Sequence, residues 1–112
     1  MATIPLNTFK TTTANVTTSS TNVYTTPAGV TTVVLLAQVS NIDATESVTI
    51  SANHIRGSNS TSIIKNTTIP VADATNLLLG KLILQTGDSF NISASANSRA
   101  QLVLSYLETA NA

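Results

Sequence analysis

Val30–Val39 reads VTTVVLLAQV and is the most apolar stretch of this sequence. It is too short to predict a helix, and its Val and Thr side chains are β-branched, which favours strands. A short apolar run of this kind is typical of a strand that is buried on both faces near the centre of a sheet. The stretch therefore predicts the central strand of an all-β fold.

Further β-rich runs flank this stretch and are separated by turn residues. Before it, Asn22–Thr26 leads into the sequence PAG at 27–29, and a Pro-X-Gly turn between two such runs predicts a hairpin. After it, Ser47–Ala52 alternates polar and apolar residues, as a strand with one buried face does. Asn53–Thr61, with Gly57 at its centre, is the most loop-like segment.

The C-terminal half continues the same pattern. Residues 62–65 and 67–71 read as two short strands, or as one bent strand that stops at Pro70, and 72–76 as a connection. Leu77–Gln85 carries Gly80 in its middle, which predicts a bulge or kink. Residues 89–96 alternate cleanly, and Ala100–Glu108 reads as the last strand.

Seven or eight short strands are thus expected, with a turn about every ten residues and no helix. Such spacing is typical of a small antiparallel β-sandwich with a jelly-roll-like arrangement, and an open barrel is the main alternative. The length of 112 residues fits one domain. We expect an extended Thr-rich N-terminal arm over residues 1–21 with at most one strand, a sandwich over 22–108, and a frayed tail over 109–112.

The composition argues against catalytic chemistry. Thr, Ser and Asn make up about two-fifths of the residues, charged residues only 9%, and Cys is absent. These residues suit strands and turns, but they leave one His, five acids and five bases from which to build a site. A net charge of zero gives no electrostatic footprint for nucleic acid or an anionic membrane. We therefore expect no enzyme, no cofactor, no metal, no nucleic acid and no membrane partner. No secretory signal is expected either.

The few reactive side chains each have a plainer interpretation. His54 is the one candidate general base, but no nucleophile motif accompanies it, so a loop His that makes surface or subunit contacts is expected together with Arg56. Asp43 and Glu46 share a loop that could bind a hard cation, although two acids in a turn are usually just solvated. Asp88 is expected to cap backbone N–H groups in a turn.

Low surface charge suggests that much of the surface lies against other protein. The candidate interface residues are Leu6 and Phe9 in the arm, His54 and Arg56 in the expected loop, and the amphipathic Tyr24 and Tyr106, which could also be core edges.

Several stretches together resemble a known family. They are VYTTPAGVTTVVL at 23–35, IPV at 69–71, GKLILQTGD at 80–88, ASA at 94–96 and LVLSYLE at 102–108. With them the chain resembles, over about residues 22–108, a family of small virion structural proteins of tailed bacteriophages, notably marine and cyanobacterial ones. The resemblance implies a repeated, non-enzymatic subunit of a phage particle and brings no catalytic residues with it.

Within a virion, the resemblance favours a capsid decoration (cement) protein that binds the outer shell and stabilises it. Its partners would be the major capsid protein or other virion proteins, with a homo-oligomer, most simply a trimer, at the capsid surface after synthesis in the host cytoplasm. The arm over residues 2–20 would add a strand to a neighbouring sheet. The alternative is a tail, neck, baseplate or fibre subunit. A carbohydrate-binding or receptor-binding sandwich fits less well, because aromatic residues are 4% and Trp is absent.

Overall fold

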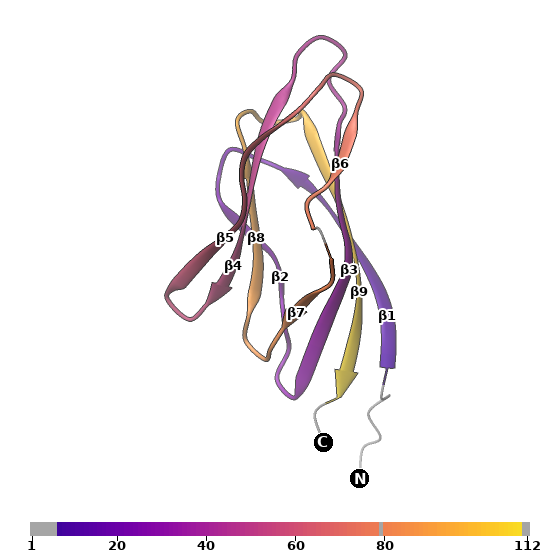
Figure 1. Ribbon diagram of the computed structural model, residues 1–112, viewed down its shortest axis with the longest axis vertical. Coiled ribbons are helices and arrows are strands. Elements are labelled where there is room, and N and C mark those ends of the chain that lie inside the picture. Colours follow the sequence, from indigo (N-terminus) through magenta and orange to yellow (C-terminus); the bar gives the residue numbers. More distant parts are fainter. Residues whose placement is uncertain (1–6, 79, 111–112) are drawn as a thin grey trace.

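The computed structural model describes residues 7–78 and 80–110 (Figure 1). Over these residues the chain forms nine strands and no helix, and the strands lie in two antiparallel sheets that face each other. The predicted all-β sandwich is confirmed, with nine strands in place of seven or eight.

The first sheet, sheet A, has the order β1-β9-β3, and two short strands share the far edge of β3. Its strands are β1 (Asn7–Val16), β9 (Ala100–Ala110), β3 (Val30–Asn41), β6 (Ala74–Asn76) and β7 (Leu82–Leu84). The second sheet, sheet B, has the order β2-β8-β4-β5. Its strands are β2 (Thr21–Thr25), β8 (Ser89–Ala94), β4 (Val48–Arg56) and β5 (Asn59–Ile69).

Most connections cross from one sheet to the other. If β6 and β7 are counted as one interrupted strand, each sheet has four positions, and this strand order is jelly-roll-like. The turn at 27–29 therefore does not close a hairpin, because β2 pairs with β8 in sheet B whereas β3 pairs with β9 in sheet A. Local turn residues show where the chain reverses, but not whether the two strands pair.

β3 occupies the centre of sheet A, as the sequence predicts, but it is buried on one face only. Its side chains Thr32, Val34, Ala37 and Val39 point between the sheets and are fully buried. Leu35, at a β-bulge, is 38% exposed on the other face. A two-layer sandwich has no third layer to cover that face. The stretch therefore contains more apolar residues than the buried face of β3 needs, and the others lie on the outer face.

The core lies between the two sheets and follows the predicted alternation in β4 and β8. Its fully buried large side chains come from both sheets: Phe90, Ile50, Ile69, Leu84, Ile92, Leu102, Leu104, Val16, Val34, Val39 and Val48. The outward-facing positions of β4 and β8 are largely Thr, Ser and Asn. These polar residues mark the outer face of each strand without charge, so the chain has one well-defined inner layer.

The expected loop over Asn53–Thr61 is wrong. β4 continues to Arg56 and β5 begins at Asn59, so only two residues form the connection, with Gly57 at a φ of +61°. Glycine adopts this left-handed backbone without the steric cost of a side chain, and two-residue hairpins need such a residue. His54 and Arg56 consequently lie on a strand, not in a loop.

The segment from 59 to 85 also differs in detail from the expected pattern. β5 is one bent strand, the second of the two interpretations above, with register shifts and a φ of +53° at Asn66. The expected connection contains β6, and within the stretch 77–85, Leu82–Leu84 forms β7, which pairs with β3. Gly80 lies between β6 and β7, where the edge of the sheet is interrupted.

The expected domain boundary at residue 21 differs from the structure. Asn7–Val16 of the expected arm is β1, which pairs with β9 along its whole length and contributes Val16 to the core. Residues 1–6 lie outside the described residues, and the candidate interface residue Leu6 is one of them. At the other end, Thr109 and Ala110 belong to β9 and are not a frayed tail, because they pair with Asn7 and Val30.

Candidate interaction surface

The outer face of sheet A carries an apolar row that crosses four strands. The register of the sheet places Phe9 of β1 opposite Leu107 of β9, Leu107 opposite Val33 of β3, and Val33 opposite Ile83 of β7. Successive side chains of a strand point to opposite faces, so residues opposite one another share a face. Neighbouring inward residues such as Val34 are fully buried, which places this row on the outside.

Much of the exposed apolar surface gathers on this face. Phe9 is 73% exposed, Ile83 50%, and Leu35 and Val103 38% each. These are four of the six large apolar side chains that are exposed among the described residues. A contiguous apolar surface of this kind is typical of a contact with another macromolecule, whereas scattered single residues would need no explanation.

Among the described residues, the paired positions on either side of this row carry no charged side chain. The rows beside the apolar one are Asn7–Thr109–Thr31, Thr11–Ser105–Leu36, Thr13–Val103–Gln38–Asn76 and Asn15–Gln101–Ser40–Ala74. Burying a charge against a partner is costly unless it is paired, so protein interfaces have few charges at their centre. A partner can therefore bind to the outer face of sheet A without leaving a charge buried and unpaired.

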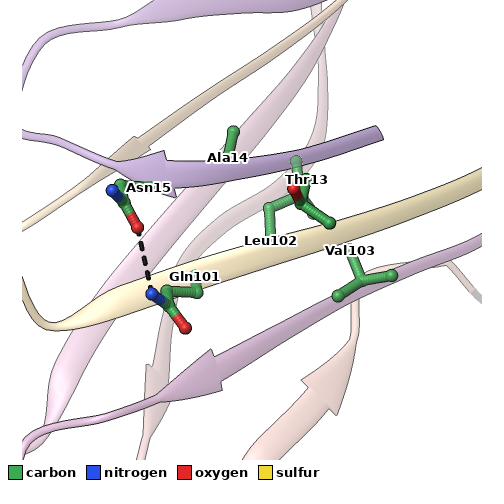
Figure 2. Close-up of a pocket in the computed structure, with 6 residues that line it drawn as sticks. All are labelled: Thr13, Ala14, Asn15, Gln101, Leu102 and Val103. Atoms are coloured by element: carbon green, nitrogen blue, oxygen red, sulfur yellow. Dashed lines mark hydrogen bonds between the residues drawn. The ribbon is translucent and has the colours of Figure 1, made fainter. Parts of the chain in front are cut away.

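Two shallow hollows lie on this face above β1 and β9. The first, of about 340 Å³, is lined by Thr13, Asn15, Gln101 and Val103 together with the neighbouring Ala14 and Leu102 (Figure 2). A hydrogen bond of 3.1 Å from Gln101 Nε2 to Asn15 Oδ1 spans it. The second, of about 310 Å³, is lined by Phe9, Lys10, Thr11, Leu35, Ser105 and Tyr106. Amide, hydroxyl and apolar groups suit binding, and the first hollow is lined by no ionisable side chain.

The predicted pair His54 and Arg56 meets Asp88 at one end of sheet B. Arg56 donates two hydrogen bonds to the Asp88 carboxylate, of 3.0 Å from Nε and 2.7 Å from Nη2. His54 Nε2 lies 3.0 Å from Asp88 Oδ2, and the backbone N–H of Gln85 donates to the same oxygen at 2.9 Å. Asp88 therefore caps its turn, as predicted. The carboxylate is enclosed by donors from β4 and from its own turn, so this cluster joins β4 to the turn before β8.

These contacts make Asp88 a source of pH-dependent stability. The hydrogen bonds from Arg56, helped by those from Gln85 and His54, hold the pKa of Asp88 well below its ordinary value, although burial acts in the opposite direction. A carboxyl group whose pKa is lowered on folding stabilises the fold above its unfolded pKa of about 3.9 and loses that contribution as the pH falls further.

Asp88→Asn is accordingly expected to lower the free energy of unfolding at pH 7 by about 2–3 kcal/mol, since hydrogen bonds to a buried charged group are lost. Urea denaturation between pH 7 and pH 2 measures this. The difference between wild type and variant should shrink below about pH 4, because Asp88 of the unfolded chain begins to take up a proton there while the folded carboxyl group is still ionised. Asp73→Asn, at an exposed position, is the control and should change little. A difference that stays constant down to pH 2 would contradict this role.

Tyr24 and Tyr106 contact each other between the sheets, with ring centroids 4.4 Å apart. The Tyr24 hydroxyl donates to Glu108 Oε2 at 2.6 Å and lies 2.7 Å from Thr32 Oγ1. Lys10 Nζ pairs with the other Glu108 oxygen at 2.8 Å. Tyr106 is buried and Tyr24 is half-buried. Their contact therefore joins sheet A to sheet B inside this end of the sandwich.

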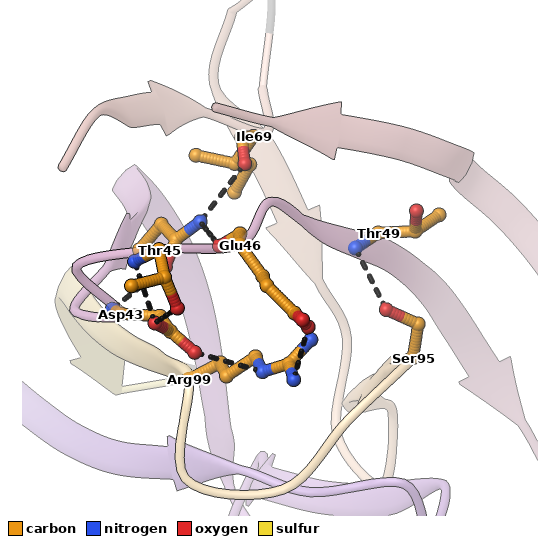
Figure 3. A network of polar contacts seen from close by, with 8 residues as sticks. Asp43, Thr45, Glu46, Thr49, Ile69, Ser95 and Arg99 are labelled. Atoms are coloured by element: carbon orange, nitrogen blue, oxygen red, sulfur yellow. Dashed lines mark hydrogen bonds and ion pairs between the residues drawn. The ribbon is translucent and has the colours of Figure 1, made fainter. Parts of the chain in front are cut away.

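A second polar network ties the loops at the opposite end (Figure 3). Arg99 forms ion pairs with Asp43, at 2.9 Å, and with Glu46, while Asp43 Oδ1 also accepts hydrogen bonds from Thr45. The hydrogen bonds from Thr45, more than the charge of Arg99, lower the pKa of Asp43. These carboxylates are occupied by a cation of the chain itself. Within residues 7–78 and 80–110, no group of three or more His, Cys, Asp or Glu side chains could hold a metal ion.

The apolar row was not predicted from the sequence except for Phe9. Val33, Ile83 and Leu107 are far apart in the chain, and only the register of four strands brings them together. One signal was available: VVLL at 33–36 and LIL at 82–84 are apolar at successive positions, so each must present apolar side chains on both faces of its strand.

Comparison with known proteins shows the fold. The sequence matches no family model and no curated protein. Among solved structures, a protein of the Bacillus endospore appendages, described as disulfide-linked pili, superimposes with a TM-score of 0.56 at 8% identity, over 100% of this chain and 98% of that one.

A pentameric capsid protein from metagenomic phage sequences gives a TM-score of 0.44 at 15% identity, over 88% of this chain, which spans 60% of that chain's length. The tumour necrosis factor Eiger from S. frugiperda gives 0.46 at 13% identity, over 91% and 87%. Of these three, only the appendage protein has a TM-score above 0.5, and at 8% identity it shows that this chain shares its fold and no more.

Proposed function

We propose that this chain is a non-enzymatic structural subunit of a phage virion, and specifically a capsid decoration protein that docks on the outer shell through the outer face of sheet A. The observation that carries the proposal is the uncharged, apolar character of that face, where Phe9 and Ile83 are at least half exposed. The partner surface would be likewise uncharged and apolar, because such a surface would leave no charge unpaired on contact.

The shared fold of the appendage protein supports an assembling subunit, since that protein belongs to a pilus. Those pili are disulfide-linked, whereas this chain has no Cys. Any assembly of this chain is therefore held by non-covalent contacts. Weak contacts suffice for a decoration protein, because many copies on one shell act together.

Binding of the purified chain to shells that lack it tests the proposal. Val103→Lys places a charge on the outer face of sheet A, and Val71→Lys is the matched control, because Val71 is also 38% exposed but lies in the loop before β6. We expect Val103→Lys to weaken binding at least about tenfold, equivalent to about 1.4 kcal/mol, and Val71→Lys to bind as wild type. Equal binding of the two variants, with unchanged melting temperatures, would contradict the proposed docking face.

A tail, neck, baseplate or fibre subunit remains the alternative within the virion, and the same face could serve there. A glycan-binding role is supported less well. Glycan sites usually stack sugars on exposed aromatic rings. Among the described residues Phe9 is the one exposed aromatic side chain, since Tyr24 is half-buried and Phe90 and Tyr106 are buried.

A further inference from the structure

The edge of sheet A at β1 is long, straight and open. β1 runs for ten residues, NTFKTTTANV, and pairs with β9 in one unbroken register from Asn7 to Val16. Its other side has no neighbouring strand in the described part of the chain. Alternate backbone N–H and C=O groups along an edge strand point away from the sheet, so this edge can accept a further strand.

The other three edges of the sandwich carry features that oppose such pairing. β2 has five residues with a register shift, and β6 and β7 have three residues each. β5 is long, but it has register shifts, Asn66 at a φ of +53°, and Pro70 directly after its end. Short strands, bulges and proline are the usual protections of an edge. β1 has none of them, and its one charged residue, Lys10, is held by Glu108.

We propose that β1 pairs antiparallel with β1 of a second copy of this chain. Such a pair is self-complementary about a two-fold axis, so the same edge serves both subunits. A pairing centred on Thr11 uses residues 7–15 of each copy and places Thr11 opposite Thr11, Phe9 opposite Thr13 and Lys10 opposite Thr12. No like charges then lie directly opposite each other, whereas a pairing centred on Lys10 would oppose the two ammonium groups.

This pairing has a consequence for the outer face. An antiparallel pair of edges is related by an axis perpendicular to the sheet, so both copies turn the same face to the same side. The apolar row from Phe9 to Ile83 in one copy then meets the row that begins with Thr13 and Val103 in the other copy, and the two outer faces form one continuous surface. A two-fold pair closes with two subunits and so predicts a dimer, in place of the trimer expected from the family resemblance.

Cysteine cross-linking tests the pairing directly, because the chain contains no Cys of its own. In Thr11→Cys the two new thiols would face each other at a Cα separation of about 4.5–5.5 Å, which a disulfide can bridge. Thr68→Cys is the matched control, because Thr68 is an exposed residue of the edge strand β5. We expect a covalent dimer from most of the oxidised Thr11→Cys protein and from little of the control. Equal cross-linking of the two variants would overturn the proposal.

Sedimentation equilibrium gives a second, independent readout. The wild type and Thr68→Lys should have the mass of a dimer, whereas Thr11→Lys should be a monomer with an unchanged melting temperature, because it opposes two ammonium groups at the pair axis. A monomeric or trimeric wild type would also overturn the proposal. The outcome is separable from the docking proposal, because Val103→Lys should weaken shell binding and leave the dimer intact.

Discussion

A chain that lacks residues 2–16 is expected not to fold. The deletion removes β1, which the sequence predicts as part of an extended arm, and leaves β9 with an unpaired edge. It also takes Val16 out of the core and uncovers Leu102 and Leu104, all of them fully buried. Small domains are stable by only about 5–15 kcal/mol, and losing an entire sheet strand is expected to bring the free energy of unfolding close to zero.

Thermal unfolding followed by circular dichroism measures this effect. Val16→Ala in the full chain serves as the control, since it removes one buried side chain while β1 stays in place. We expect the control to unfold cooperatively with a loss of about 1–2 kcal/mol, by scaling from the burial energy of a valine side chain. A sharp unfolding transition in the truncated chain would show that β1 is not an integral strand of sheet A.

Phe90→Ala is the second change with a large expected effect. Phe90 lies in β8 at the centre of sheet B, is fully buried, and pairs with Tyr24 and His54 on the neighbouring strands. Truncation of a buried Phe leaves a cavity that a rigid sandwich fills only in part, which costs about 3–5 kcal/mol. Chemical denaturation at pH 7 should show a lower midpoint with an unchanged slope.

Phe9→Ala is the matched control, because the same side chain is removed from a position that is 73% exposed. Surface substitutions of this kind usually change stability by less than about 0.5 kcal/mol. The contrast between the two variants is the prediction. If Phe9→Ala destabilised the isolated chain as much as Phe90→Ala, Phe9 would have to lie in the core, and the outer face of sheet A would be misassigned.

The sequence predicted what depends on local alternation. In Val48–Ala52 and Phe90–Ala94, every second residue is apolar, and the structure buries those residues between the sheets except Ala94, which packs partly buried against the core. Period-two alternation is sufficient here because only one face of each strand is covered. The turn at Asp88 was also predictable, because Asp caps its own turn with little help from distant residues.

The other features of the fold and of the candidate site depend on contacts between residues that are far apart in the sequence. Asp88 meets Arg56 across 32 residues of sequence, and β1 pairs with β9 across the whole chain. No local pattern states which strands become neighbours or in which register. The apolar row on sheet A could not be assembled from sequence for that reason, although LIL at 82–84 and VVLL at 33–36 each showed more apolar residues than one face of a strand can hold.

The central claim is that this chain is a repeated subunit of a virion shell, and its copy number in purified phage particles tests that claim most directly. Quantitative mass spectrometry would compare its copy number with that of the most abundant shell protein in the same particles. The account predicts a copy number comparable to that of the shell protein. A few to a few tens of copies would move the subunit to the tail or neck, and absence from the particle would contradict the account.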